Sequence, residues 1–539
     1  MSTQEWWKNS VGYQIYPRSF QDSNGDGIGD IRGIISRLDY LVELGVDFIW
    51  INPVYKSPNV DNGYDISDYE AIQPEYGTLD DVKELIAACH QKNIKVLFDL
   101  VVNHTSNLHP WFVEAMKSKD NPYHDYYLFV DNDGTTPPNN WESFFGNSAW
   151  EYVPQLQQSY LHIFAKEQPD LNWKNKAMRA EIYQMMRFWL DLGLDGFRLD
   201  AISHIQKADW AVPMVKTDKW RNFMNVAGIE QYMTELKQVF DEYHVLTVGE
   251  ASGVSSKKAP EWTGDGGYIN MIFELEHNQK TGKNGSEVID LPAYQDVIYR
   301  WQRDQLKEGW NALYIENHDN PRAATIFGND NPEYLKTLAL SYFLLRGTPF
   351  IYQGQEIGMT NFPYSKVEQF DGVDAKMQYA DWLAKGDDEL TALKKVGRVS
   401  RDNSRTPMQW SGETNAGFTN ATPWMNVNPD YTTRNVASEE QDAASLLSFY
   451  KQLISLKKSS AAFGTGTIKL ITSEPGQFVF ERVNEDASYL VVANLTTLDV
   501  ELPAAIVNNY QTGKIVLSTG AAADITKVKP GTGLVIQKG

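Results

Sequence analysis

The chain has 539 residues, which is too long for one ordinary hydrophobic core and predicts one large domain with one or two smaller ones. Hydrophobic residues make up 42% of it and aromatic residues 12%, which excludes wholesale disorder. The formal net charge of −21 argues against nucleic acid and anionic membranes as partners and favours a neutral or cationic ligand.

Cysteine usage and the first residues bear on the compartment. Cys89 is the single cysteine, so no intramolecular disulfide can form, and the chain fits a reducing compartment. Residues 1–12 lack the basic and apolar pattern of a signal peptide, and no stretch approaches about eighteen consecutive apolar residues. We therefore expect a soluble cytoplasmic protein without a membrane partner.

Short apolar runs alternate with longer helical patterns through most of the chain. The predicted strands cover 12–16, 46–51, 94–101, 194–199, 244–248, 270–273, 312–315 and 349–352. Amphipathic segments predict helices at 33–44, 79–91, 176–192, 228–242 and 332–345. Strands separated by helices pair in parallel, so the pattern predicts an α/β fold, the closed (β/α)8 TIM barrel.

Two segments interrupt this alternation, and the pattern changes near the end. Residues 104–173 are rich in aromatic residues, Pro, Gly and Asn and are too long for a loop, which predicts an inserted subdomain. Residues 360–441 carry many charges and polar turns. Short β-like runs at 467–471, 478–482, 489–494 and 533–536 predict a small C-terminal antiparallel β-sandwich domain. The expected domains are a barrel (1–103 and 174–461), the insert (104–173) and the C-terminal domain (462–539).

A loop near the N-terminus offers oxygen atoms at alternate positions. Its expected ligands are Asp22, Asn24, Asp26, the Ile28 carbonyl and Asp30, with Gly27 at the sixth position for a sharp turn. These are the first nine positions of a calcium-binding loop, but Gly33 occupies the twelfth, where a Glu is usual. We predict a structural Ca²⁺ without a catalytic role; the alternative is an Asx-rich turn without metal.

The predicted strand at 194–199 ends in an arginine and an acid. Arg198 and Asp200 are two residues apart, so in a strand their side chains project from one face. An arginine this close favours the ionised carboxylate and lowers the pKa of the acid, which suits a carboxylate nucleophile. The alternative is a structural ion pair.

Three acids follow three predicted strands. Asp200, Glu250 and Asp319 come after the fourth, fifth and seventh strands, at the strand ends where barrels of this kind hold their active sites. Two carboxylates flanking a glycosidic bond suffice for hydrolysis, one as nucleophile and one as general acid. Each acid alone could equally be a surface residue or a helix cap.

Six segments carry a resemblance to a known family. They are residues 99–104 (DLVVNH), 196–200 (GFRLD), 248–250 (VGE), 317–319 (NHD), 168–173 (QPDLNW) and 401–410 (RDNSRTPMQW). The first four are similar to the signature regions of the α-amylase family, glycoside hydrolase family 13. The last two are similar to its branch of oligo-1,6-glucosidases, maltases, dextran glucosidases and sucrose isomerases.

The resemblance implies a role for each acid and a retaining mechanism. Asp200 becomes the nucleophile, Glu250 the general acid/base, and Asp319 the acid that binds sugar hydroxyls and stabilises charge in the transition state. We expect Arg198 to keep Asp200 ionised, and Glu250, without an adjacent cation, to have a raised pKa. No redox or organic cofactor is needed, and similar loops in this branch hold a structural Ca²⁺.

The resemblance also implies residues around a terminal glucose. Tyr64 offers an aromatic platform, and an Asp61–Arg401 pair closes the pocket and enforces exo action; Tyr64 and the two phenylalanines could equally belong to a core. The expected substrate-binding residues are Asp61, Tyr64, His104, Phe145, Phe164, Gln168, Arg198, Ala201, His318 and Arg401.

Ala201 bears on which bond is cleaved. In the resembling branch, enzymes that prefer α-1,6 bonds tend to carry valine at this position, so alanine favours a maltase-type α-1,4-glucosidase with possible transglucosylation, and an oligo-1,6-glucosidase is the alternative. Sucrose isomerase is disfavoured, because residues 276–280 read EHNQK, without the arginine-rich motif of those enzymes. Trehalose-6-phosphate hydrolase, a mid-chain amylase and an inactive accessory protein are further alternatives. We expect a small α-glucoside as partner and a monomer or weak oligomer.

Overall fold

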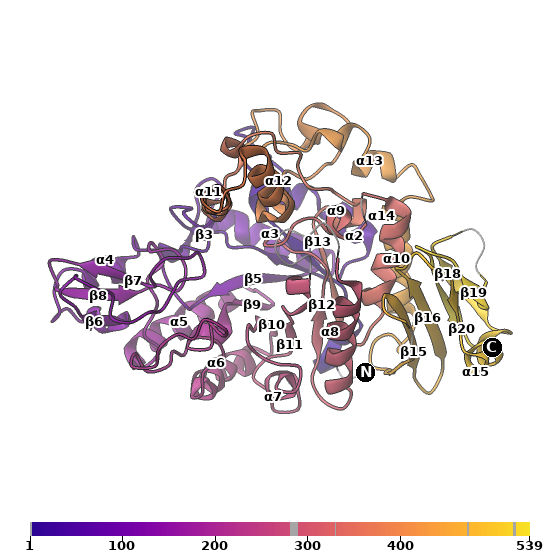
Figure 1. Cartoon of the computed structure of the whole chain (residues 1–539), viewed down its shortest axis with the longest axis horizontal. Helices are drawn as coiled ribbons and strands as arrows, with labels where there is room; N and C mark the ends of the chain where they lie inside the picture. Colours follow the sequence, from indigo (N-terminus) through magenta and orange to yellow (C-terminus); the bar gives the residue numbers. More distant parts are fainter. Residues whose placement is uncertain (1–2, 281–288, 329, 472–473, 521–523) are drawn as a thin grey trace. The chain divides into compact units, whose positions relative to one another are not determined.

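Eight parallel strands close into a barrel, which confirms the predicted fold class (Figure 1). The computed structural model of the chain describes residues 3–280, 289–328, 330–471, 474–520 and 524–539. Around the barrel the order is β1-β13-β12-β11-β10-β9-β5-β2. These strands are Gly12–Ile15 (β1), Phe48–Ile51 (β2), Lys95–Val101 (β5), Gly196–Asp200 (β9), Leu246–Glu250 (β10), Met271–Phe273 (β11), Asn311–Leu313 (β12) and Thr348–Tyr352 (β13).

The chain divides into two compact units. One consists of Met1–Ile49, Gln91–Ile94 and Leu275–Gly539, and the other of Trp50–His90 and Lys95–Glu274. The boundaries of the predicted barrel, insert and C-terminal domain remain predictions. We refer to the two groups as the first and second unit and describe each by itself.

In the second unit, β9 lies between β5 and β10 and carries Arg198 in its middle. Arg198 is in register with Asp99 on β5 and with Val248 on β10. Gly196 begins the strand, where a Cβ atom would lie 1.9 Å from the carbonyl oxygen of Leu246, so only glycine fits between the neighbouring strands.

The second unit also contains helices, and part of the 104–173 segment forms its own sheet. The helices are Leu79–Gln91 (α3), Pro110–Ala115 (α4), Lys176–Asp191 (α5), Ile229–Tyr243 (α6) and Ala259–Thr263 (α7). Asn175 caps α5, because its side chain accepts hydrogen bonds from the amides of Ala177 and Met178. The small sheets are Tyr55–Lys56 (β3) with Asp68–Ile72 (β4), and Phe129–Asp131 (β6), Gln158–Leu161 (β8) and Trp150–Val153 (β7). The three-stranded sheet projects away from β9–β11 at the far left of Figure 1.

In the first unit, the predicted helix at 33–44 is divided in two. It consists of Ile31–Ser36 (α1) and Leu38–Leu44 (α2), because Arg37 leaves the helical conformation with ψ of 7°. Residues 360–441, predicted as polar turns, contain two substantial helices, Val373–Ala384 (α11) and Glu389–Val399 (α12). The remaining helices are Leu291–Asp304 (α8), Ala323–Ile326 (α9), Pro332–Phe343 (α10), Val436–Glu439 (α13), Leu446–Ser459 (α14) and Ala504–Tyr510 (α15).

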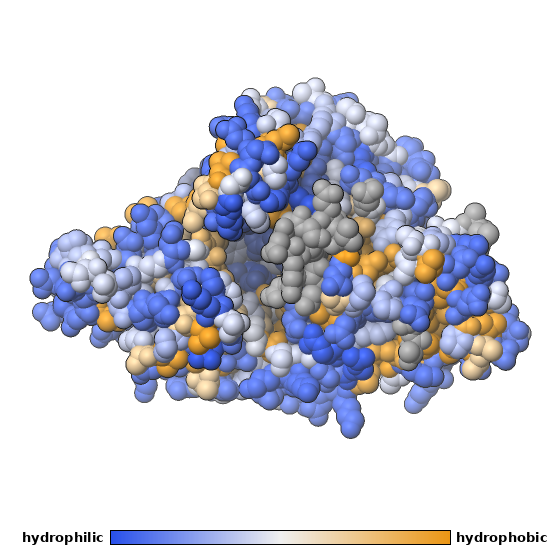
Figure 2. Space-filling view, viewed as in Figure 1, coloured by the Kyte–Doolittle hydropathy of each residue, from blue (hydrophilic) through white to orange (hydrophobic). Residues whose placement is uncertain are grey.

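The C-terminal segment forms the predicted antiparallel sheet. Its order is β14-β15-β16-β20-β18, from Thr467–Leu470, Gln477–Val483, Ser488–Asn494, Gly533–Gln537 and Lys514–Ser518. A second layer of Val500–Glu501 (β17), Lys527–Val528 (β19) and α15 covers a core that includes Leu490, Val492 and Tyr510. Hydrophilic residues dominate the visible face in Figure 2, and no helix in the described residues is long and apolar enough to cross a membrane.

Candidate active site

Arg198 of β9 is the centre of a buried charge cluster in the second unit. Its Nη1 lies 2.6 Å from Asp99 Oδ1 and 2.6 Å from Asp200 Oδ1, and its Nη2 lies 2.7 Å from Glu250 Oε2. The Arg198 side chain is only 2% exposed. Arg198 and Asp200 therefore share one face of the strand, as predicted. The expectation that Glu250 has no adjacent cation is wrong, because β10 lies beside β9 and brings Glu250 to the same guanidinium.

One cation shared by three carboxylates leaves an excess of negative charge. Burial raises the pKa of Asp200 well above its ordinary value; Arg198 opposes this rise, and the charges of Glu250 and Asp99 add to it. Arg198 therefore acts on the pKa of Asp200 in the expected direction, but burial and the two neighbouring carboxylates outweigh it, so the expected net lowering is wrong. Burial also raises the pKa of Asp99, against the opposing effect of Arg198 and of hydrogen bonds from Trp50 and Tyr64. The cluster therefore retains a proton at a pH where isolated carboxyls have lost theirs.

Ala201 follows Asp200 in a left-handed backbone conformation. Its φ is 44° and its ψ 31°, which is uncommon for a residue other than glycine. In this conformation its amide N–H donates to Glu250 Oε2 at 3.3 Å. The residue predicted to influence linkage thus contacts the predicted acid/base through its backbone.

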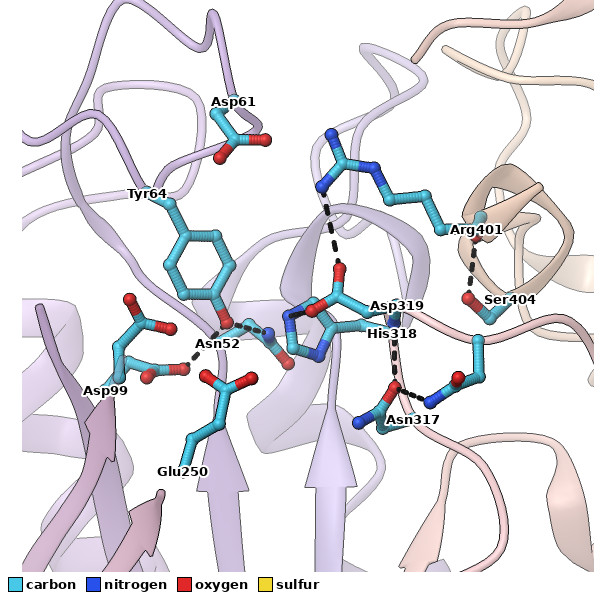
Figure 3. A network of polar contacts seen from close by, with 12 residues as sticks. Asn52, Asp61, Tyr64, Asp99, Glu250, Asn317, His318, Asp319, Arg401 and Ser404 are labelled. Atoms are coloured by element: carbon cyan, nitrogen blue, oxygen red, sulfur yellow. Dashed lines mark hydrogen bonds and ion pairs between the residues drawn. The ribbon is translucent and has the colours of Figure 1, made fainter. Parts of the chain in front are cut away.

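Six predicted substrate-binding residues lie together in the second unit. The Tyr64 hydroxyl donates to Asp99 Oδ2 at 3.0 Å and accepts from Asn52 Nδ2 at 2.7 Å (Figure 3). His104 Nε2 lies 3.0 Å from the Tyr64 carbonyl oxygen, and Gln168 Nε2 lies 3.1 Å from His104 Nε2.

The same group continues to an acid and two aromatic rings. Gln168 Nε2 donates to Asp61 Oδ2 at 3.1 Å. The Phe164 ring lies 5.1 Å from the imidazole of His104 and 6.2 Å from the ring of Phe145. Carboxylate, amide, imidazole and aromatic groups are the set that a pyranose ring and its hydroxyls require.

A second charge cluster, in the first unit, surrounds Asp319. Its carboxylate lies 3.1 Å from His318 Nε2 and 3.6 Å from Arg401 Nη1 (Figure 3). It also lies 2.9 Å from Arg405 Nη2. Gln14 on β1 lies 2.8 Å from the other ring nitrogen of His318. The structure therefore brings together Asp319, His318 and Arg401, while the Asp61–Arg401 pair, whose members belong to different units, remains a prediction.

Sequence reasoning missed several members of these clusters. Asp99 opens the 99–104 signature region, and Arg405 lies within the 401–410 motif. Their place in these recognised motifs could have identified both as site residues. Asn52 and Asp374, whose Oδ1 lies 3.1 Å from Arg401 Nε, lie outside every recognised segment.

The predicted calcium loop is tightly hydrogen-bonded. Asp22 accepts hydrogen bonds from three backbone amides and from the hydroxyl of Thr419. Burial favours a raised pKa for Asp22, but these hydrogen bonds outweigh it and lower the pKa. Asp30 caps α1 by accepting from the Gly33 amide. The described residues contain no group of three or more His, Cys, Asp or Glu side chains arranged to hold a metal, so a calcium site depends on the carbonyl and amide oxygens of the loop as well.

Comparison with known proteins agrees with this geometry. Residues 14–466 match the model of the α-amylase catalytic domain. A probable oligo-1,6-glucosidase of Bacillus subtilis is 47% identical over 91% of both chains, and an oligo-1,6-glucosidase of Parageobacillus thermoglucosidasius is 44% identical over 95% of this chain and 94% of its own. The crystal structure of a trehalose-6-phosphate hydrolase from Bacillus licheniformis has a TM-score of 0.93 at 39% identity, covering 99% of both chains. The chain therefore belongs to the α-amylase family, glycoside hydrolase family 13, and is a glycoside hydrolase.

Proposed function

We propose that this protein is a retaining, exo-acting α-glucosidase that releases glucose from the non-reducing end of short α-1,6-linked glucosides such as isomaltose. The observation that carries the chemistry is the Arg198 cluster, in which Asp200 and Glu250 share one guanidinium. The relatives named oligo-1,6-glucosidase support the α-1,6 preference. The α-1,4 preference predicted from Ala201 is not confirmed.

In the proposed first step, Asp200 attacks the anomeric carbon while Glu250 donates its proton to the glycosidic oxygen. The bond from carbon to the leaving sugar breaks, and a glucosyl ester forms on Asp200. The geometry supports this division, because Arg198 contacts both carboxyls and compensates the charge that Asp200 carries as nucleophile. A shared guanidinium also keeps the two carboxyls close, as a retaining mechanism requires at about 5–5.5 Å.

In the second step, Glu250 accepts a proton from water as the water oxygen attacks the same carbon and releases Asp200. The product keeps its anomeric configuration because two inversions occur. We assign the binding of sugar hydroxyls to Asp61, His104, Gln168, His318, Asp319 and Arg401. Another sugar in place of water would give transglucosylation.

Initial rates on isomaltose and maltose test the linkage preference. We expect kcat/KM for isomaltose to exceed that for maltose; a clear excess for maltose would contradict the α-1,6 assignment. Ala201 favours that second candidate, because removing two methyl groups next to the nucleophile changes the space for the leaving sugar by an amount worth about 1–3 kcal/mol.

The same measurement should include sucrose and trehalose 6-phosphate. The solved relatives include an isomaltulose synthase and a trehalose-6-phosphate hydrolase. Isomerisation of sucrose or selective cleavage of the phosphorylated sugar would replace the proposed activity. Inactivity on every sugar would favour an accessory role.

We also propose that the 22–30 loop binds a structural Ca²⁺ through Asp22, Asn24, Asp26, the Ile28 carbonyl and Asp30. All five atoms are hard oxygen donors, and hydrogen bonds already fold the loop. Chelation with EGTA should lower the melting temperature, and added Ca²⁺ should restore it; an unchanged melting temperature would contradict this site.

The single, buried Cys89 supports a cytoplasmic location, and we propose a monomer or weak oligomer.

A further inference from the structure

Lys207 is a buried lysine beside the proposed glucose site, and no step of the mechanism uses it. Its side chain is 4% exposed, and its Nζ lies 2.9 Å from Asp170 Oδ2, whose side chain is fully buried. The ammonium also donates to Asn103 Oδ1 at 2.7 Å and to the carbonyl oxygen of His204. It therefore joins three segments: the end of β5, the 168–173 motif and the turn after the nucleophile strand.

The contact with Asn103 fixes the orientation of that side-chain amide. With its oxygen held by the ammonium, the amide directs Nδ2 toward His104 Nδ1, 3.2 Å away. His104 Nε2 faces the carbonyl oxygen of Tyr64, which can only accept, and His104 Nδ1 faces the amide donor of Asn103, so Nε2 carries the proton. Gln168 Nε2, 3.1 Å from the same His104 nitrogen, then donates to Asp61 Oδ2 and not to the imidazole. The ammonium thus selects the tautomer of His104 through one intervening amide.

Lys207 also acts on the charge of His104. Burial lowers the pKa of His104 to about 4; Asp170 and the Tyr64 carbonyl oppose this, and Lys207 acts in the same direction as burial. The charged groups around the imidazole are Lys207, Asp170 and, through Gln168, Asp61. A neutral imidazole with a fixed N–H can donate to a sugar oxygen without changing the charge of the site.

The same lysine joins the two segments that carry His104 and Gln168. These segments pair through hydrogen bonds from the Leu171 amide to Asn103, from the Thr105 amide to Pro169 and from the Asn107 amide to Glu167. Lys207 bridges the side chains of Asn103 and Asp170 across this pairing. A buried ion pair is weak support for stability, because desolvation offsets its attraction, but it can fix a unique arrangement.

We propose that Lys207 is a positioning residue that sets the tautomer and the location of His104, and with it Gln168, for glucose binding. This inference rests on the proposed function, in which His104 and Gln168 contact the sugar. It predicts that replacing the ammonium damages catalysis through His104 and not through the fold.

A double-mutant cycle tests this route. Lys207→Met keeps the volume and removes the charge, and kcat/KM on p-nitrophenyl α-glucoside is measured for it, for His104→Ala and for the double variant. We expect Lys207→Met to lower kcat/KM about 30-fold in the wild-type background, within the range for directly coupled residues, and less than about 3-fold in the His104→Ala background. Equal losses in both backgrounds would overturn the proposal, and so would an unchanged kcat/KM.

A second readout is the pH profile. Removing the ammonium leaves Asp170 uncompensated beside His104, so the pKa of His104 should rise and kcat/KM of Lys207→Met should acquire an extra decline as pH falls toward 5. A profile parallel to that of the wild type would contradict the effect on His104. Should Lys207→Met fail to fold, Asn103→Asp carries the test, since it removes the amide donor to His104 while keeping a partner for Lys207.

Lys219→Met is the matched control. Lys219 also joins the insert to the segment after β9, through Glu142 at 2.6 Å, but the two side chains are 42% and 46% exposed. Exposed pairs contribute little, so we expect kcat/KM within about twofold of wild type; a 30-fold loss here would show that any link between these segments matters and would contradict a specific role for Lys207. Inactivity of the wild type on every glucoside would contradict the proposed function, whereas an active wild type with additive variants would contradict only the role of Lys207.

Discussion

The two charge clusters of this protein have opposite balances. In the second unit, Arg198 alone serves Asp99, Asp200 and Glu250, and its side chain is buried. In the first unit, the carboxylate of Asp319 lies beside Arg401, Arg405 and His318, of which Arg401 also pairs with Asp374, and the Asp319 side chain is 40% exposed. An excess of carboxylates retains a proton, whereas an excess of cations stabilises a permanent anion.

This difference matches the two tasks that a retaining hydrolase requires. Proton transfer and nucleophilic attack need a pair of carboxyls of which one is protonated and one ionised. Binding of sugar hydroxyls and of a developing positive charge needs a carboxylate that stays ionised throughout. Substitutions in one cluster at a time should therefore affect the two tasks separately.

Removing the nucleophile should have the largest effect. Asp200→Asn keeps the size of the side chain but cannot form the glucosyl ester, so we expect kcat to fall by at least about 10⁴-fold. The measurement is the steady-state rate on p-nitrophenyl α-glucoside, with circular dichroism as a control for folding. Full activity in this variant would contradict the assigned mechanism.

Removing the central cation should distinguish the two clusters. Arg198→Met leaves three carboxylates without their shared cation, and breaking a buried pair costs about 3–5 kcal/mol of stability. Arg405→Met leaves the half-exposed Asp319 with Arg401, His318 and solvent, so we expect it to cost less stability than Arg198→Met, although Arg405 is itself buried. Urea unfolding followed by tryptophan fluorescence gives both values, and equal losses would contradict the contrast.

The acid limb of the pH–rate profile should report the shared proton. Because the pKa of Asp200 lies above its ordinary value of 3.8, kcat/KM should decline at a pH above that value. Glu250→Gln removes one neighbouring charge, so the limb measured with an activated aryl glucoside should move to lower pH. Arg405→Met should leave the limb in place, and a shift there would contradict the assignment to the Arg198 cluster.

The same shift affects stability with a definite sign. A carboxyl whose pKa is higher in the folded state binds more protons there than in the unfolded chain, so its contribution to stability decreases as pH rises through that window. In Asp200→Asn, stability should no longer decrease for this reason as pH rises. Melting temperatures of wild type and Asp200→Asn between pH 4 and 8 provide the comparison.

The smallest effects are expected at Ala201. Its left-handed conformation disfavours a β-branched side chain, so Ala201→Val should destabilise the protein by about 1–2 kcal/mol and Ala201→Gly should not. The valine should also raise the ratio of isomaltose to maltose activity, by about tenfold. A lower ratio would contradict a link between this position and the bond that is cleaved.

The barrel and the main acids could be predicted from sequence because their signals are local. Each barrel strand is a short apolar run, and the shared face of Arg198 and Asp200 follows from a two-residue period. The contacts of Arg198 with Asp99 and Glu250 could not, because they depend on which strands are neighbours. The burial of Asp200, which is the largest cause of its raised pKa, has no signal in a two-residue period either.

Other features lacked a local signal. Helix α11 buries only Ala375 fully, so it has no clear apolar stripe to reveal it within a charged segment. Lys207 follows Asp200 without any recognisable motif, and its partners Asn103 and Asp170 are far away in sequence. The roles of such residues can be recognised only from the folded structure.

In the proposed mechanism, Asp200 forms a covalent bond with glucose while Glu250 supplies and removes the proton. Incubation with 5-fluoro-α-glucosyl fluoride, followed by peptide mass mapping, tests it directly, because the fluorine slows hydrolysis of the glucosyl ester. We expect a fluoroglucosyl label on the peptide that contains Asp200, and no label in Asp200→Asn. A label on another residue, or turnover of the reagent without any covalent intermediate, would contradict it.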